Sequence, residues 1–120
     1  MKFGSFVKEL RAQNRIGLRE FCLKNNLDPS NWSKIERGIL PPPKNREIIL
    51  DMARSFALKE NSNEWNDLFD LAALDAGMIP HDIINNQNLI GKLPIFFRTL
   101  RGQKPTDDEI EELIKVIKEN

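Results

Sequence analysis

The sequence predicts an all-α fold, on two observations. Every stretch with a regular apolar pattern repeats its apolar residues at helical spacing. No stretch shows the alternation, rich in Val, Ile and Thr, that a half-buried strand needs. The length of 120 residues provides one domain, or a small domain with an appendage, and argues against an enzyme whose cleft lies between two lobes.

The first two helices are predicted from apolar spacing and from their caps. Residues 3 to 14 carry apolar side chains at positions i, i+3, i+4 and i+7, which is typical of an amphipathic helix. Gly17 can serve as the N-cap of a short second helix, whose apolar face includes Phe21 and Cys22. Asn26 tolerates the left-handed conformation of a C-cap, so the second helix should end there.

A third helix follows after a short turn. Asp28 and Pro29 form a pair of N-cap and first helical residue. This helix should run to about Arg37, because Gly38 follows as a stop. Two short helices are therefore joined by a turn of about three or four residues.

Four further helices are predicted downstream. Pro43 is expected to open the fourth, Pro94 to lie in the first turn of the sixth, and Thr106 with Glu109 to form a capping box for the last. The apolar residues that define these four helices are, in chain order, Ile49, Met52, Ala53 and Phe56; Trp65, Leu68, Phe69 and Ala72; Leu93, Phe96, Phe97 and Leu100; and Ile110, Leu113, Ile114 and Ile117.

Charge is unevenly distributed along the chain, although its sum is zero. Residues 1 to 46 hold ten Lys and Arg against four Asp and Glu, a balance of +6, and the remaining 74 residues hold a balance of −6. This distribution indicates that the basic N-terminal part binds a polyanion and that the acidic remainder has a different function. A solvated surface with an uneven charge split explains the same numbers.

The residue inventory excludes several kinds of chemistry. Cys22 has no partner for an intrachain disulfide, and with His81 it falls short of the ligand count of a structural zinc site. His81 and Asp82 are expected as turn and cap residues, without a catalytic triad or phosphate loop beside them, so an enzyme is not expected. The apolar runs are too short for a bilayer, and no signal peptide is visible. We expect a cytoplasmic protein without metal, other cofactor or membrane attachment.

The outer face of the third helix is suited to nucleic acid. An α-helix fits the DNA major groove, where hydroxyls, lysines and arginines can bond base edges or phosphates. An ordinary solvated helix face has a similar composition. On a helical wheel Trp32 and Ile35 point to one side, and the opposite side holds hydroxyls and cations without a carboxylate, namely Ser30, Ser33, Lys34 and Arg37.

The two short helices resemble the helix-turn-helix of the phage repressor/Cro-like (XRE) family of transcription regulators. The resemblance rests on residues 16–22 and 26–38, within which Ser33-Lys34-Ile35-Glu36-Arg37-Gly38 is especially close to the family pattern. It covers roughly the first half of the chain and extends weakly to residues 93–102. It implies a five-helix-type repressor DNA-binding domain at 1–58 and a C-terminal helical extension at 59–120.

The chain departs from that family pattern at three positions. Cys22 stands where a small residue, usually Ala, is typical, and a role in the core is expected for it. Asn26 replaces the usual Gly of the turn. Trp32 replaces a smaller aliphatic residue, which predicts a remodelled core beneath the third helix.

The resemblance also implies roles for individual residues. In such regulators the second helix lies across the DNA backbone and the third enters the major groove. Arg11 and Glu36 are expected to pair and to hold the third helix at its docking angle. Base contacts are expected from Pro29, Ser30, Ser33 and Lys34, and phosphate contacts from Arg19, Asn31, Arg37, Lys44 and Arg46.

The function that follows is sequence-specific binding of double-stranded DNA by a transcription regulator that represses by occluding a promoter. A homodimer on a palindromic operator is expected, because a lone recognition helix reads only a few base pairs. An alternative is an antitoxin, whose acidic C-terminal part binds a toxin while its N-terminal part represses their shared operon. The dimerisation candidates in the C-terminal helices are Phe96, Phe97, Ile110, Leu113 and Ile117.

Overall fold

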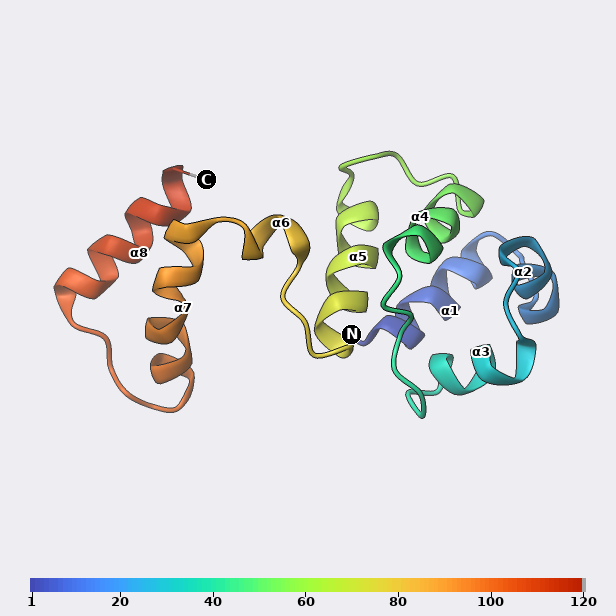
Figure 1. The fold of residues 1–120 in the computed structure, drawn as a ribbon, viewed down its shortest axis with the longest axis horizontal. Coiled ribbons are helices and arrows are strands. Elements are labelled where there is room, and N and C mark those ends of the chain that lie inside the picture. Colours follow the sequence, from blue (N-terminus) through green and yellow to red (C-terminus); the bar gives the residue numbers. More distant parts are fainter. Residues whose placement is uncertain (120) are drawn as a thin grey trace. The chain divides into compact units, whose positions relative to one another are not determined.

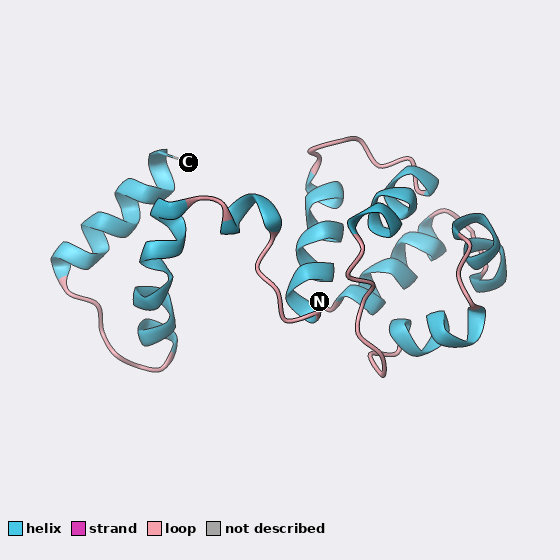
Figure 2. Cartoon of the chain, in the orientation of Figure 1, coloured by secondary structure: helices cyan, strands magenta, loops and turns pink. Residues whose placement is uncertain are grey.

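A computed structural model describes residues 1–119, and these residues form eight helices and no strands (Figure 2). The predicted all-α class is therefore confirmed. Among the described residues no helix has the length and apolar character needed to cross a membrane. The helices are α1 (Phe3–Gln13), α2 (Leu18–Asn25), α3 (Pro29–Glu36), α4 (Arg46–Ser55), α5 (Asn63–Asp75), α6 (His81–Ile84), α7 (Gln87–Leu100) and α8 (Asp107–Glu119).

The chain forms two compact units (Figure 1), of which the first is Met1–Pro80 and the second begins at His81. The expected boundary between residues 58 and 59 is therefore displaced by one helix. The reason is that α5 packs against α1 and α4 and contributes Leu68 and Ala72 to the core of the first unit. An amphipathic helix has to cover its apolar stripe, and α5 covers it within the first unit.

Aromatic side chains organise the core of the first unit. Trp32 from α3 is 1% exposed and lies between Phe3 of α1 and Phe21 of α2, with ring centroids 6.1 and 5.4 Å away. Phe21 stacks in turn on Phe56, which follows α4, at 5.1 Å. The expected remodelling at Trp32 is thus an aromatic cluster that joins α3 to α1 and α2. Cys22 lies in the same core, and burial raises the pKa of its thiol.

Most of the predicted helix ends are confirmed. Gly17 is the N-cap of α2, and Asn26 ends that helix in the left-handed conformation at φ 55° and ψ 48°. Asp28 caps α3, where its carboxylate accepts a bond from the Asn31 N–H at 2.9 Å. These are local interactions between residues at most four positions apart, which is why the sequence predicts them.

Two predicted helix starts are wrong, and both were assigned to a proline. Helix α4 begins at Arg46 and not at Pro43, because the side chain of Asn45 caps it by accepting the Glu47 N–H at 2.9 Å. Helix α7 begins at Gln87, capped by Asn86, so that Pro94 lies inside the helix and not in its first turn. In both places asparagine, a strong N-cap residue, sets the start of the helix.

Candidate nucleic-acid interface

Helices α2 and α3 are joined by a tight turn at residues 26–28. The left-handed Asn26 reverses the chain, and the Leu27 N–H donates to the carbonyl of Cys22 at 2.8 Å. Asp28 then starts α3 at once. Because the turn is fixed at both ends by hydrogen bonds, α2 holds α3 in one orientation.

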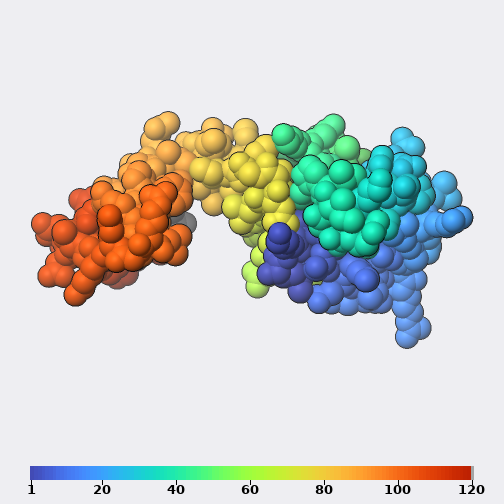
Figure 3. All heavy atoms as spheres, turned by 90° about the horizontal axis from the view of Figure 1, so that it is seen from below, coloured from blue at the N-terminus to red at the C-terminus, as the bar shows by residue number. Residues whose placement is uncertain are grey.

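The residues predicted to contact bases lie on the outer side of α3. Pro29, Ser30 and Lys34 are exposed, and Ser33 is half-buried. Trp32 faces the core, so the burial pattern divides the helix as the helical wheel predicts. In Figure 3 the cyan spheres of α3 and the loop after it lie at the surface of the first unit.

A charged pair, Arg11 of α1 and Glu36 of α3, holds helix α3 against α1. Arg11 donates to both carboxylate oxygens of Glu36, from Nε at 2.8 Å and from Nη2 at 2.7 Å, and its Nη1 donates to the Ile16 carbonyl at 3.1 Å. The side chains are only 12% and 5% exposed. The hydrogen bonds that Arg11 donates to Glu36 raise the pKa of the Arg11 guanidinium despite its partial burial. This is the pair that the family resemblance implies, in a bidentate geometry.

A second contact between α1 and α3 involves backbone alone. Gly4 lies so close to the last turn of α3 that an added Cβ would be 2.4 Å from the Ile35 carbonyl oxygen and 2.6 Å from that of Glu36. Only glycine fits at this distance. The N-terminal turn of α1 and the C-terminal turn of α3 are therefore in direct van der Waals contact.

One predicted phosphate contact lies beside two predicted base contacts. Arg19, at the start of α2, lines an open hollow of about 780 Å³ together with Pro29 and Ser30 at the start of α3. Leu23 lines the same hollow and is 85% exposed, which sequence reasoning missed. Its signal in the sequence is a leucine that lies off the apolar face defined by Phe21 and Cys22.

The N-termini of α2 and α4 differ in their capacity for an anion. Gly17 provides no side-chain cap to α2, so the first backbone N–H groups of that helix can bond a phosphate. Both helices carry a carboxylate in the first turn, Glu20 in α2 and Glu47 in α4, but at α4 the Glu47 N–H already bonds Asn45. The N-terminus of α2 therefore has more unbonded backbone N–H groups for an anion than that of α4.

Other predicted phosphate contacts lie apart from the Arg19 hollow. Lys44 is exposed in the loop before α4, and the guanidinium of Arg46 lies 4.6 Å from the ring centroid of Phe69 in α5. Asn31 is exposed, with its backbone N–H bonded to the cap of α3. The Arg37 Nε donates to the Ser33 carbonyl at 3.2 Å.

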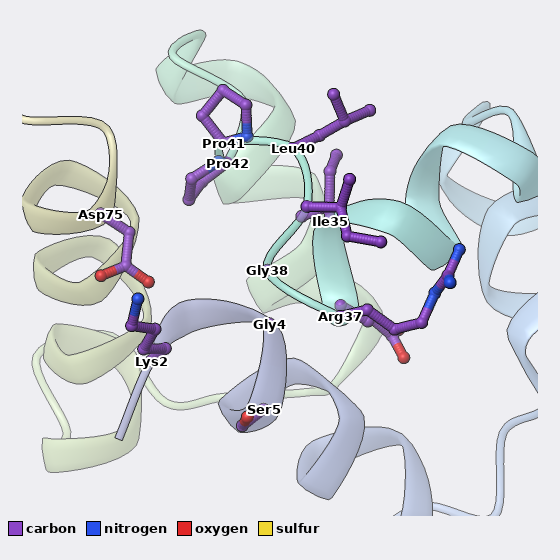
Figure 4. A pocket seen from close by; sticks show the side chains of 12 residues that line it. Lys2, Gly4, Ser5, Ile35, Arg37, Gly38, Leu40, Pro41, Pro42 and Asp75 are labelled. Atoms are coloured by element: carbon purple, nitrogen blue, oxygen red, sulfur yellow. The ribbon is translucent and has the colours of Figure 1, made fainter.

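Arg37 also lines a second hollow, of about 290 Å³, together with Lys2 and Asp75 (Figure 4). Asp75, at the end of α5, accepts a bond from the Phe3 N–H at 2.7 Å. It supplies the cap that Lys2, the N-cap residue, does not provide to α1. Sequence reasoning missed this contact because the partners are 72 residues apart.

The protein is all-α, and its helices α2 and α3, joined by a tight turn, present hydroxyls and cations on the outer side of α3. No family model, curated protein or solved structure matches the chain. Among the described residues, no group of three His, Cys, Asp or Glu side chains could hold a metal ion.

Proposed function

We propose that this protein is a sequence-specific DNA-binding transcription regulator that represses by occluding a promoter. The observation that carries the proposal is the fixed presentation of α3: Arg11 and Gly4 hold it from α1, while Ser30 and Lys34 point outward. A short, rigidly held helix with donors and cations on its outer side suits the major groove. The resemblance of the same segment to XRE regulators supports this function independently of the geometry.

Within this proposal the exposed side chains divide between base and phosphate contacts. Ser30 and Lys34 bond base edges, with Ser33 at the margin, and the ring of Pro29 contacts a thymine methyl group. Arg19 and the uncapped N-terminus of α2 bind the phosphate next to them. Lys44, Arg46, Asn31 and Arg37 provide further backbone contacts that are insensitive to sequence.

The charge distribution over the two units weakens the argument for an antitoxin. Residues 81–120 contain six Lys and Arg against seven Asp and Glu, which is nearly neutral. Residues 47–80 contain two against seven, so most of the negative balance belongs to the segment that includes α4 and α5. The second unit therefore lacks the excess of acidic residues that would favour binding of a toxin by the C-terminal part. The regulator is the one function that we propose.

The test is selection of bound duplexes from a random DNA pool at low salt. We expect a palindromic motif to be enriched, with half-sites one or more helical turns apart. With about eight phosphate contacts per dimer, affinity for the selected duplex should fall about 10³- to 10⁵-fold between 50 and 200 mM salt. Absence of any enriched sequence at 50 mM salt would overturn the proposal.

A further inference from the structure

The side chain of Arg46 contacts an aromatic ring and not an oxygen atom. Its guanidinium lies 4.6 Å from the ring centroid of Phe69 in α5. Within residues 1–119 no hydrogen bond or ion pair engages this guanidinium. Because a ring covers only one face of a planar guanidinium, the N–H groups at its edges stay free to bond. Other arginines in the same range bond to or pair with oxygen atoms, namely Arg11, Arg37, Arg54 and Arg98.

The backbone of Arg46 is fixed at the start of α4. Arg46 is the first residue of that helix and is exposed. It lies between Asn45 and Glu47, which are joined by the cap at 2.9 Å. The cap therefore sets the point from which the Arg46 side chain extends.

The ring that contacts Arg46 is fixed within α5. Phe69 is half-buried and packs against the core of the first unit. Trp65 lies four residues earlier on the same face of the helix, with its ring centroid 5.1 Å from that of Phe69. The Trp65 backbone N–H donates to the Ser62 hydroxyl at 3.2 Å, which caps α5. The Phe69 ring is thus restrained by the core and by Trp65.

We propose that Phe69 is a positioning residue for DNA binding, whose ring holds the Arg46 guanidinium ready to bond a DNA phosphate. The inference rests on the proposed function, in which Arg46 is a phosphate contact. An arginine side chain that moves freely loses conformational freedom when it binds, and a side chain already restrained by a ring loses less. Helix α5, which lies outside the helix–turn–helix, therefore contributes to the affinity for DNA.

An aromatic ring suits this role better than a carboxylate would. A carboxylate would neutralise the guanidinium and compete with the phosphate for the same N–H donors. A ring attracts the cation through its face and leaves those donors free. Since a phosphate contact carries no sequence information, Phe69 should affect the affinity for every duplex alike.

The test is a double-mutant cycle between Phe69 and Arg46 in the full chain. Affinity is measured for the duplex that the wild type selects and for a scrambled duplex. Phe69→Leu should weaken binding to both duplexes by about 2- to 5-fold. Phe69→Tyr keeps the ring and should bind as tightly as the wild type. In the Arg46→Ala background Phe69→Leu should cause no further loss, because Phe69 acts through Arg46.

Lys44→Ala is the matched control, because Lys44 is the predicted phosphate contact two residues before Arg46 and is exposed in the loop. Phe69→Leu should weaken binding by the same factor in the Lys44→Ala background as in the wild type. Far-UV circular dichroism and thermal unfolding check that each variant is folded at the temperature of the titration. Phe69→Tyr retains the ring and its packing, so the comparison does not depend on the leucine variant alone.

An equal loss from Phe69→Leu with and without Arg46 would overturn the inference, as would wild-type affinity in Phe69→Leu. Either result leaves the selection of a sequence by α3, and thus the proposed function, standing. A wild-type protein that binds DNA without preferring any sequence would overturn the proposed function. The cycle measured with the scrambled duplex would then still decide whether Phe69 positions Arg46.

Discussion

The indole N–H of Trp32 donates to Glu36 Oε2 at 2.7 Å, four residues along α3. The same carboxylate accepts two bonds from Arg11 of α1. The buried Glu36 therefore links Trp32, in the aromatic core, to Arg11. Trp32 is one of the three positions at which the sequence departs from the XRE pattern that it resembles. Its ring fills the space between Phe3 and Phe21, and its polar N–H adds a third bond to the group that fixes α3.

Loss of Arg11 should destabilise the first unit more than loss of the indole bond. Arg11→Ala leaves the Glu36 carboxylate buried without a cation, which costs about 3–5 kcal/mol. Trp32→Phe removes one of three bonds and some packing, which costs about 1–3 kcal/mol. Urea unfolding followed by circular dichroism measures both, with exposed Lys8→Ala as a control within about 0.5 kcal/mol of wild type. The reverse order of the two variants would contradict the central role given to the charged pair.

Replacement of Gly4 and of Gly91 by alanine should have opposite effects. Gly4→Ala forces backbone atoms of α1 and α3 apart and should cost about 1–3 kcal/mol or more. Gly91 lies inside α7 with nothing within 4 Å of an added Cβ, so alanine should stabilise the second unit by about 0.5–1 kcal/mol. Thermal unfolding compares the two variants. A neutral Gly4→Ala would show that the contact between α1 and α3 is looser than described.

Lys34 and Arg46 should differ in their effect on DNA binding. Lys34→Ala should relax sequence preference, because Lys34 lies on the outer face of α3. Arg46→Ala should weaken binding to all sequences alike and reduce the slope of log affinity against log salt by about 1. Titration of each variant with selected and scrambled duplexes at several salt concentrations makes the comparison. The same uniform loss in both variants would contradict the division between base and phosphate contacts.

The α7–α8 hairpin should lose stability in acid. The bond from the Thr106 backbone N–H, with the nearby Arg98, lowers the pKa of Glu109, and Lys92 lowers that of Glu112. A carboxyl with a lowered pKa in the folded state stabilises that state above its ordinary pKa, and this contribution is lost as pH falls through the lowered value. The protection factors of the α8 amides, which compare the observed with the intrinsic exchange rate at each pH, should therefore decrease below the usual glutamate range.

Glu109→Gln provides the matched variant for this pH dependence. It should speed exchange in α8 at pH 7 and flatten the dependence on pH, because the amide cannot ionise. Both tryptophans, Trp32 and Trp65, lie in the first unit, so their fluorescence reports separately whether that unit stays folded. Equal acid sensitivity of α8 in the variant and the wild type would show that another group controls the transition.

The sequence alone determined the helical class and the helix ends that depend on close neighbours. Asn26, Asp28 and the reciprocal bonds between Thr106 and Glu109, at 3.0 and 3.1 Å, act within three or four residues. A pattern along the chain contains all that such interactions need. The starts of α4 and α7 were missed because Pro43 and Pro94 were expected at or near the start of each helix, whereas Asn45 and Asn86 cap them.

The tertiary structure alone decided which helix faces meet. Apolar periodicity shows which side of a helix is buried but not which helix covers it. The placement of α5 in the first unit, the approach of Gly4 to α3, and the bond from Phe3 to Asp75 therefore had no signal in the local pattern. The same reason applies to Trp32: the sequence predicted a remodelled core, and only the packing of three helices brought its indole N–H to the carboxylate that Arg11 binds.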